Sequence, residues 1–360
     1  MSTTTRRIGS STFPAIGFGA LCIAGFYGKP EEDEERFKVL DAVHASGCTF
    51  WDTAISTPTR RCLLGNGLSG QASATTYSSA RKLDSIPTCR STGVPEHIKA
   101  STEQALKTLG VDYIDLLLLQ RADANIPIEH SIGAMVDLVR DGKVKYIGIS
   151  EVAANTLRRA HAVYPMAAVE MEYSPLDLSI EDPSTNLLAT ARELGIPVIA
   201  YSPLCRGLLT GRIRSTDELE ATDFRRAIPR LNGPNFHNIL KIADGLKEVG
   251  AQYNGATAAQ TCLAWMLAQG DDIIPIPGTK KIKYLQENMK ALEVQLSPEH
   301  VQEIRELSVR ADAAQASVTR LTSTLPWLSL RRLSFNYRNL FETVITGARA
   351  DFVLGARMGI

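Results

Sequence analysis

The sequence lacks an excess of charge of either sign, since 39 Lys and Arg residues balance 39 Asp and Glu residues. Neither a nucleic-acid partner nor an acidic membrane partner is therefore indicated. The six cysteines are scattered without a C-x-x-C pair, which disfavours a zinc centre or a disulfide framework. No uninterrupted apolar run approaches the about 18 residues of a membrane-spanning helix, and the first 15 residues lack the apolar segment of a secretory signal. We therefore expect a soluble, cytoplasmic protein.

Neither of the two common glycine-rich nucleotide motifs occurs where it would be needed. The sequence contains no G-x-x-x-x-G-K-[ST] run, which excludes a Walker P-loop. No G-x-G-x-x-G run follows the first predicted strand, which disfavours a doubly wound dinucleotide-binding domain. A bound nucleotide would therefore have to be held by another kind of loop.

Short apolar runs alternate with amphipathic stretches along most of the chain. Strands are predicted at 13–19, 49–54, 113–120, 144–151, 167–174, 196–203 and 272–278. Helices are predicted at 30–47, 95–110, 128–142, 153–164, 187–195, 254–270 and 282–293. Strands that are apolar nearly throughout, each followed by a helix, indicate a parallel sheet covered on both faces. The number of strands approaches that of an α/β fold of the (β/α)8 TIM-barrel type, with the doubly wound open sheet as the competing topology.

Two segments break this pattern. Residues 66–94 are rich in Ser, Thr, Gly and Ala where a third strand-helix unit is due, so that unit is interpreted as degenerate and a regular strand is not expected there. The Arg-rich tail from residue 311 to residue 360 has no clear period and is interpreted as an added helix, a partner contact or a disordered end. We expect a barrel domain over residues 1–310 and a C-terminal extension over 311–360.

The carboxyl ends of the predicted strands offer the candidate functional residues, because a barrel of this type places its site there. Asp52, Gln120 and Ser150 stand at three of these ends. The run YSPLCRGLLTGR (201–212) follows a strand with small residues and two Arg, as a pyrophosphate-binding loop would. The run PGTKKIKYLQEN (277–288) puts two Lys at the start of a helix, which favours a phosphate, although a solvated basic helix start is the alternative interpretation.

Several longer runs are similar to a known family. They include FPAIGFG, GCTFWDTA, LGVDYIDLL, GKVKYIGISE, ELGIPVIAYSPL and DDIIPIPGTKKIKYLQEN, and with the shorter matches they cover about residues 8–310. The sequence resembles the aldo-keto reductase family, in the fungal and plant-type branch related to potassium-channel β subunits. The resemblance implies a TIM barrel that binds NADP(H) in extended form and acts on a small carbonyl compound.

The resemblance also implies which residues bind the cofactor. Tyr201 would stack on the nicotinamide, and Lys280 or Lys281 would meet the 2′-phosphate. The remaining cofactor-binding positions carried over from the family are Ser150, Glu170, Ser202, Leu204, Gly207, Gly278, Thr279, Tyr284, Glu287 and Asn288. Glu170 departs from the family, which has a Gln there to hold the nicotinamide amide.

The residues implied for catalysis depart further from the family, which uses Asp, Tyr, Lys and His. Asp52 is retained, but Thr57 stands in place of the Tyr and Gln120 in place of the His. The nearest match to the Lys is Lys82, inside the degenerate segment. Asp52 either pairs with Lys82 or is satisfied by the backbone.

A Thr hydroxyl cannot donate a proton usefully at neutral pH, whereas Gln120 can still donate a hydrogen bond to a carbonyl oxygen. Loss of general acid catalysis lowers a rate by about 10²–10⁴. Tyr27, in GFYGKP, matches a position near the substrate in relatives and is the preferred substitute acid, with simple pocket lining as the alternative. Among the six histidines, His237 is expected in a long loop after the seventh strand, closest to the barrel mouth.

Three functions remain open on the sequence. The first is an atypical NADP(H)-dependent oxidoreductase acting on a small hydrophobic carbonyl compound, with secondary metabolism as the expected context in fungal relatives. The second is a redox-neutral isomerase, dehydratase or cyclase that reuses the pocket, with Asp52 or Glu170 as its base. The third is a catalytically silent NADP(H)-binding protein. None of them requires a metal ion, and each takes a small molecule as its ligand.

Overall fold

The structure is a computed structural model that describes residues 4–24, 27, 31–54, 78–83, 93–221, 223–228 and 231–322. Eight parallel strands form one sheet in the order β10-β9-β8-β7-β6-β5-β4-β3. They are β3 (Phe18–Gly19), β4 (Phe50–Ala54), β5 (Ser78–Leu83), β6 (Ile114–Leu119), β7 (Val144–Ser150), β8 (Ala168–Glu172), β9 (Val198–Tyr201) and β10 (Ile273–Pro275). The predicted parallel α/β barrel is therefore confirmed, and the competing open sheet is not formed.

Backbone hydrogen bonds close the sheet between its first and last strands. The Gly17 N–H donates to the Pro275 carbonyl at 3.0 Å, and the Gly19 N–H donates to the Pro277 carbonyl at 3.3 Å. The two backbones approach so closely that a Cβ atom on Gly278 would lie 2.2 Å from the carbonyl oxygen of Gly19. Only glycine fits at this position, because the obstructing atom belongs to the main chain.

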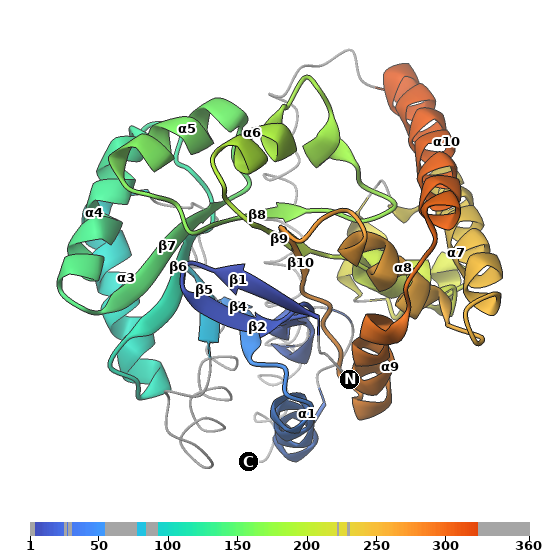
Figure 1. Cartoon of the computed structure of the whole chain (residues 1–360), viewed down its shortest axis with the longest axis horizontal. Coiled ribbons are helices and arrows are strands. Elements are labelled where there is room, and N and C mark those ends of the chain that lie inside the picture. Colours follow the sequence, from blue (N-terminus) through green and yellow to red (C-terminus); the bar gives the residue numbers. More distant parts are fainter. Residues whose placement is uncertain are drawn as a thin grey trace, which may run out of the picture.

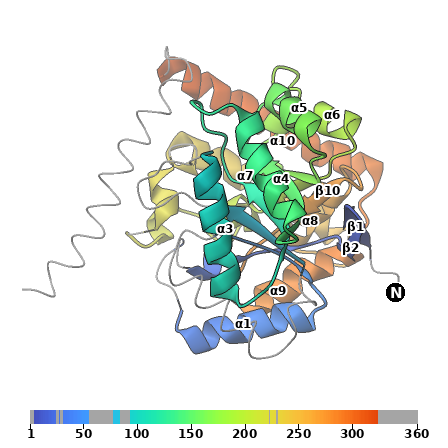
Figure 2. The same ribbon diagram turned by 90° about the vertical axis from the view of Figure 1, so that its left-hand side faces the viewer.

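Helices surround the strands, as Figures 1 and 2 show. They are α1 (Asp33–Ala45), α3 (Pro95–Leu109), α4 (Ile128–Arg140), α5 (Ala154–Val163), α6 (Leu187–Glu193), α7 (Pro234–Ala251), α8 (Ala258–Leu267), α9 (Ile282–Met289) and α10 (Pro298–Thr322). No helix in the described part of the chain is long and apolar enough to cross a bilayer.

Helices α7 and α10 go beyond the sequence prediction. Helix α7 replaces the long loop expected after the seventh strand, because buried apolar residues at helical spacing, such as Ile239, Ile242 and Leu246, pack it onto the core. His237 is consequently an exposed residue of the first turn of α7 and not a loop residue. Helix α10 packs against α7 and continues through residue 310, where the boundary between barrel and extension was expected.

The third barrel strand forms from a segment with little apolar character. Strand β5 has the sequence SSARKL, and its backbone pairs with β4 and β6, so that Ala80 is the partner of both Asp52 and Leu116. A strand placed between two apolar neighbours gains backbone pairing on both sides, which outweighs its poor strand propensity. Lys82 takes the register position between Ala54 and Leu118, two residues beyond the partner of Asp52.

One end of the barrel is filled and covered. The hairpin of β1 (Thr5–Ile8) and β2 (Ser11–Pro14) lies across this end (Figure 1), and Phe13 stacks on Phe50 with ring centroids 4.6 Å apart. Alternate residues of the strands complete the buried apolar interior, which comprises Ile8, Phe13, Phe50, Leu116, Leu118, Ala168, Ile199, Ile274 and Ile276. A site can therefore form only at the opposite end, where the strands finish.

Arg6 fastens the covering hairpin to the barrel. Its side chain is buried and donates to the backbone carbonyls of Ile273 (3.1 Å), Leu267 (3.2 Å) and Gly270 (3.3 Å). It also forms an ion pair with Asp271 at 3.1 Å. The hairpin is thus held by hydrogen bonds between residues more than 260 positions apart in the sequence.

Replacing Arg6 by Ala is expected to lower the free energy of unfolding by about 2–4 kcal/mol, because buried carbonyls lose their donors. Arg6→Lys is expected to recover less than half of this loss, since an ammonium group lacks the planar set of donors of a guanidinium. Urea unfolding of the two variants and the wild type measures both effects. A loss of less than about 0.5 kcal/mol in Arg6→Ala, the range of an ordinary surface substitution, would contradict this account of the hairpin.

Candidate functional site

A polar layer lies directly above the apolar interior of the barrel. Asp52, Ser150 and Glu170 occur near the carboxyl ends of β4, β7 and β8, and are 6%, 0% and 0% exposed. The strand alternation that buries Phe50 and Ala168 in the interior brings Asp52 and Glu170 to the same side, two residues further along. Ser150 and Glu170 are Cα partners in the sheet. These positions put polar groups at the floor of the open end.

The Ser150 hydroxyl is a buried polar group near the open end of the barrel. Its Oγ is buried, and no hydrogen-bond partner for it exists among the described residues. Buried hydroxyls are seldom left in this state, because each costs about 1–3 kcal/mol without a partner. An amide or carbonyl group of a bound molecule would satisfy it.

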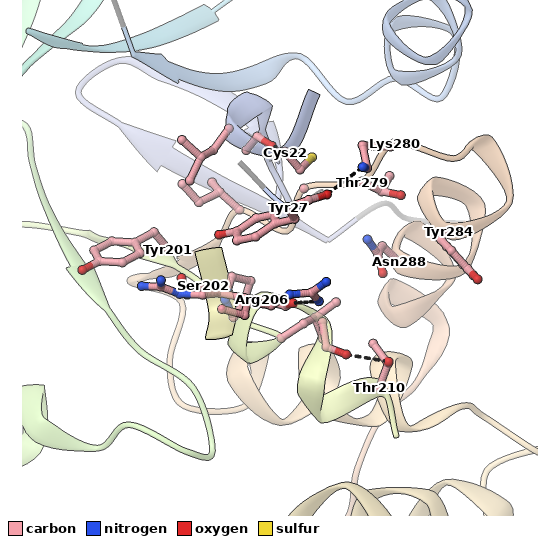
Figure 3. A pocket seen from close by; sticks show the side chains of 18 of the residues that line it. Cys22, Tyr27, Tyr201, Ser202, Arg206, Thr210, Thr279, Lys280, Tyr284 and Asn288 are labelled. Atoms are coloured by element: carbon pink, nitrogen blue, oxygen red, sulfur yellow. Dashed lines mark hydrogen bonds between the residues drawn. The ribbon is translucent and has the colours of Figure 1, made fainter. Parts of the chain in front are cut away.

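A cavity of about 430 Å³ opens at this end of the barrel (Figure 3). In Figure 3, Tyr201 and Ser202 lie at one end, Tyr284 and Asn288 lie at the other, and Tyr27 lies between them. Nine of the predicted cofactor residues line the cavity: Tyr201, Ser202, Leu204, Gly207, Gly278, Thr279, Lys280, Tyr284 and Asn288. Asp52 and Tyr27 line it as well. The structure thus brings together residues separated by more than 200 positions in the sequence.

The loop after β9 forms one wall through an unusual backbone. Ser202, Cys205 and Arg206 have φ angles of 52°, 47° and 57°, in the left-handed region that non-glycine residues seldom adopt. Gly207, with φ of 89°, follows them. Such strain occurs mostly at ligand-binding sites, where the surrounding structure enforces it.

Arg225, which also lines the cavity, braces this loop. It donates to the Arg206 carbonyl at 2.9 Å, and its guanidinium forms a bidentate pair with Asp223, with Nε–Oδ1 at 3.0 Å and Nη2–Oδ2 at 2.7 Å. Burial of Asp223 on its own raises the pKa of the carboxyl, but the hydrogen bonds and charge of Arg225 outweigh it, and the pKa lies below its usual value. The charge of Arg225 is thus compensated within the protein, which leaves other cations to meet a ligand.

The opposite wall carries the basic residues that precede α9. The Lys280 ammonium donates to the Tyr27 carbonyl at 2.8 Å, and Lys281 forms a 2.8 Å ion pair with Glu31. Glu31 raises the pKa of Lys281 by this hydrogen bond and its charge. Lys280 faces the cavity, whereas Lys281 is not among the described residues that line it. Of the two lysines predicted to bind the 2′-phosphate, Lys280 is therefore better placed to reach a molecule in the cavity.

Tyr284 and Glu287 of α9 both contact Arg212. The Arg212 guanidinium lies 4.1 Å from the centroid of the Tyr284 ring and forms an ion pair with Glu287. Arg212 and Tyr284 line the cavity, whereas Glu287 lies outside the set of described lining residues. Glu287 therefore acts on the cavity through Arg212. Because Glu287 compensates its charge, the Arg212 guanidinium stacked on Tyr284 offers mainly a planar surface at the far end of the cavity.

Tyr27 occupies the middle of the cavity (Figure 3). Burial raises the pKa of its phenol, while the charges of Arg206 and Arg225 act in the opposite direction and Glu172 adds to the rise. The Arg225 guanidinium lies 5.4 Å from the centroid of the Tyr27 ring. The phenol is therefore protonated at neutral pH. Lys280 holds the backbone carbonyl of Tyr27, and Arg225 contacts its ring.

The remaining predicted catalytic residues are placed only in part. Thr57 lies outside the described residues, and Lys82 is described by its backbone position alone. Gln120 follows β6 directly and is half-buried, but it is not among the described residues that line the cavity. The arrangement of the Asp, Thr, Lys and Gln side chains around a substrate stays a prediction.

Arg206 and Glu151 lay in segments that the sequence marked as candidates, but neither was given a role of its own. Arg206 lines the cavity, and its Nε is buried without a hydrogen-bond partner among the described residues. Glu151 follows Ser150 at the end of β7 and bonds to Tyr201. In the sequence, Glu151 is indicated only by its place at the end of a predicted strand, and Arg206 only by its place in the basic loop 201–212.

Comparison with known proteins identifies the family of this chain. The family model described as "Aldo/keto reductase family" matches residues 15–309. The chain is 49% identical over 313 residues to Aldo-keto reductase str7 of Strobilurus tenacellus, covering 86% of this chain and 93% of that protein. It is 41% identical over 323 residues to Aldo-keto reductase yakc [NADP(+)] of Schizosaccharomyces pombe, covering 88% and 94% of the two chains.

A solved structure shows the same fold at low sequence identity. The glycerol dehydrogenase of Gluconobacter oxydans superposes with a TM-score of 0.75 at 24% identity, over 86% of this chain and 97% of that chain. The match spans the barrel and therefore agrees with the sheet order and its closure. On the family model, the two relatives and the fold together, this chain belongs to the aldo/keto reductase family.

Proposed function

We propose that this protein is a cytoplasmic NADP(H)-dependent oxidoreductase that transfers a hydride between the cofactor and a small hydrophobic carbonyl compound. The observation that carries the proposal is the cavity that runs from Tyr201 to Asn288 and joins nine of the residues predicted to bind the cofactor. The relative from Schizosaccharomyces pombe is named for NADP(+), which supports this choice of cofactor. The resemblance to fungal members of the family favours a role in secondary metabolism.

The residues of the cavity fit an extended dinucleotide. At one end, the Tyr201 ring offers a flat surface, and the Ser150 hydroxyl, buried behind the lining and without a partner among the described residues, could accept a hydrogen bond from a carboxamide or donate one to it. In the middle, the loop through Arg206 and Gly207 offers the Arg206 guanidinium to a pyrophosphate. At the other end, Lys280 offers an ammonium to a phosphate. When bound, NADPH supplies the hydride.

Proton delivery is the step for which this chain needs its own solution. Tyr27 lies in the cavity and its raised pKa keeps the phenol protonated, so its hydroxyl can donate to a carbonyl oxygen that gains negative charge. An alkoxide is a stronger base than a phenolate, so the proton transfer stays favourable even with a raised phenol pKa. Tyr27 therefore takes the proton-donating role for which Thr57 is unsuited.

The apolar part of the lining favours a hydrophobic substrate. The lining includes Leu21, Pro203, Leu204, Ile213 and Ile276, and Leu21 is 38% exposed. Covering these apolar side chains with an apolar ligand removes them from water and makes the free energy of binding more favourable. A small carbonyl compound with apolar substituents fits this lining better than a sugar does.

A fluorescence titration with NADPH, followed by a panel of aldehydes and ketones, tests the proposed function. We expect NADPH to bind at micromolar concentrations and NADPH absorbance to fall with at least one hydrophobic carbonyl. Lys280→Ala is expected to weaken NADPH binding by about 10-fold, because a charge-assisted hydrogen bond is lost. The exposed Lys247→Ala of α7 serves as a matched control and is expected to bind like the wild type.

The same titration separates the alternatives. Absence of NADPH binding would overturn the proposal and favour a redox-neutral enzyme. Tight binding without oxidation of NADPH by any carbonyl would favour a catalytically silent NADP(H)-binding protein. Equal binding of NADPH by the wild type and Lys280→Ala would show that Lys280 does not hold a phosphate.

A further inference from the structure

Glu151 joins the ends of three consecutive barrel strands. It directly follows β7, and its Oε1 atom accepts a hydrogen bond from the Tyr201 hydroxyl of β9 at 2.8 Å. The same oxygen accepts from the backbone N–H of Glu172 in β8 at 3.3 Å. The Glu151 N–H donates to the Glu170 carbonyl at 3.0 Å. One carboxylate thus connects the rim of β7 to the rims of β8 and β9.

The backbone of Glu151 is strained. Its φ is 54°, in the left-handed region, where a residue with a Cβ atom costs about 1–2 kcal/mol more than glycine. Glycine would remove this cost, so we infer that interactions of the Glu151 side chain offset the backbone strain. The hydrogen bonds to Tyr201 and Glu172 are the interactions that this side chain makes.

Tyr201 is the residue most affected by this bond. Its ring packs against the apolar interior of the barrel and lines the cavity beside Ser202, whose φ of 52° is also in the left-handed region. Without a partner for its hydroxyl, a ring at a rim can turn about its side-chain bonds. The bond to Glu151 fixes the far end of the ring and leaves a face for a flat ligand.

The electrostatics keep this hydrogen bond intact over the working pH range. Burial first, and then the charges of Glu151 and Glu172, raise the pKa of Tyr201 well above its ordinary value. The Tyr201 phenol therefore stays protonated and remains the donor. The charges that face this phenol from the neighbouring elements are Glu151, Glu172 and, with the opposite sign, Arg121.

We propose that Glu151 is a positioning residue for hydride transfer, which holds the Tyr201 ring in the orientation that receives the nicotinamide. The inference rests on the proposed function, since it assigns a ligand to the face of Tyr201. Glu151 acts through Tyr201 and not on the substrate. It follows that the acceptor oxygen matters more than the negative charge.

Four single variants and one double variant test this role. Glu151→Ala removes the acceptor, and is expected to weaken NADPH binding and lower kcat/KM by about 3- to 10-fold, the effect of one lost hydrogen bond. Glu151→Gln keeps an amide oxygen as acceptor and is expected to stay within about 2-fold of the wild type. Tyr201→Phe removes the donor and should match Glu151→Ala. The double variant Glu151→Ala with Tyr201→Phe should be no worse than either single variant.

Glu151→Gly separates the backbone from the side chain. Glycine accommodates φ of 54° without strain, so this variant is expected to unfold at a higher temperature than Glu151→Ala. It should nevertheless bind NADPH as weakly as Glu151→Ala, because the carboxylate is missing. Recovery of NADPH binding in Glu151→Gly would overturn the proposed role of the side chain.

The failures of the inference and of the proposed function give different results. If the wild type binds no NADPH, the proposed function is wrong and the inference falls with it. If the wild type binds NADPH and Glu151→Ala binds it equally well, only the inference is wrong. Losses that add in the double variant would also overturn it, since they would show that Glu151 and Tyr201 act independently.

Discussion

Tyr27→Phe is expected to lower kcat for carbonyl reduction by about 10²–10⁴, the range observed when a general acid is removed. The substitution keeps the ring beneath Arg225 and the backbone carbonyl that accepts from Lys280. NADPH affinity should therefore stay within about 2-fold of the wild type, because no hydrogen bond to the cofactor is removed. Steady-state kinetics together with NADPH titration separates these two effects.

The pH dependence gives an independent check on Tyr27. Burial raises the pKa of this phenol above its ordinary value, and the proposed mechanism requires the protonated form. Activity should consequently be flat from about pH 6 to pH 9 and fall only as the pH rises through the raised pKa, above the ordinary tyrosine value of about 10. A decline centred between pH 6 and pH 8 would assign the proton donor to another group.

A matched control distinguishes the lost hydroxyl from a general effect of the substitution. Tyr164 stands at the end of α5 and is not among the described residues that line the cavity. Tyr164→Phe is expected to keep the wild-type kcat. If Tyr27→Phe also keeps it, Tyr27 lines the pocket without donating a proton, and the proposed mechanism is wrong.

Gly278→Ala is expected to destabilise the protein by about 3 kcal/mol or more, since overpacking against main-chain atoms cannot relax by a side-chain rotation. The added Cβ atom would lie 2.2 Å from the Gly19 carbonyl oxygen and 2.9 Å from the Cys22 sulfur. Separation of the two backbones would also move Thr279 and Lys280, which follow directly. We therefore expect weaker NADPH binding along with the lower stability.

Gly133→Ala is the matched control for this glycine. Gly133 lies inside α4, and a Cβ atom there would meet nothing within 4 Å. The substitution is expected to raise the free energy of unfolding by about 0.5–1 kcal/mol, because alanine favours the helix. Urea unfolding measures both variants. A Gly278→Ala protein as stable as the wild type would contradict the close approach that closes the barrel.

Much of the fold follows from the apolar pattern of the sequence. The buried strands β4, β6, β7, β8, β9 and β10 coincide with predicted apolar runs, because each is enclosed on both faces. Strand β5 has no such run, since it is held by pairing with its neighbours on either side. The predicted run at residues 13–19 contains the end of β2 as well as β3, because the chain turns from the hairpin into the barrel there.

The site was less accessible to prediction. The loop after β9 and the start of α9 could be proposed from small and basic residues alone. The hydrogen bond between Glu151 and Tyr201 joins residues 50 positions apart, and no local pattern encodes such a contact. Likewise, the left-handed conformations of Cys205 and Arg206 occur at residues whose type does not favour them. Such departures from local preference concentrate at functional sites.

The central claim is that this barrel keeps hydride transfer while its proton donor has changed. The most direct test incubates the wild type with NADPH deuterated at the transferable C4 position and a panel of hydrophobic aldehydes and ketones, and analyses the products by mass spectrometry. We expect an alcohol that carries one deuterium for each NADP⁺ formed, and far less of it with Tyr27→Phe. NADPH binding without deuterium in any alcohol would contradict the account.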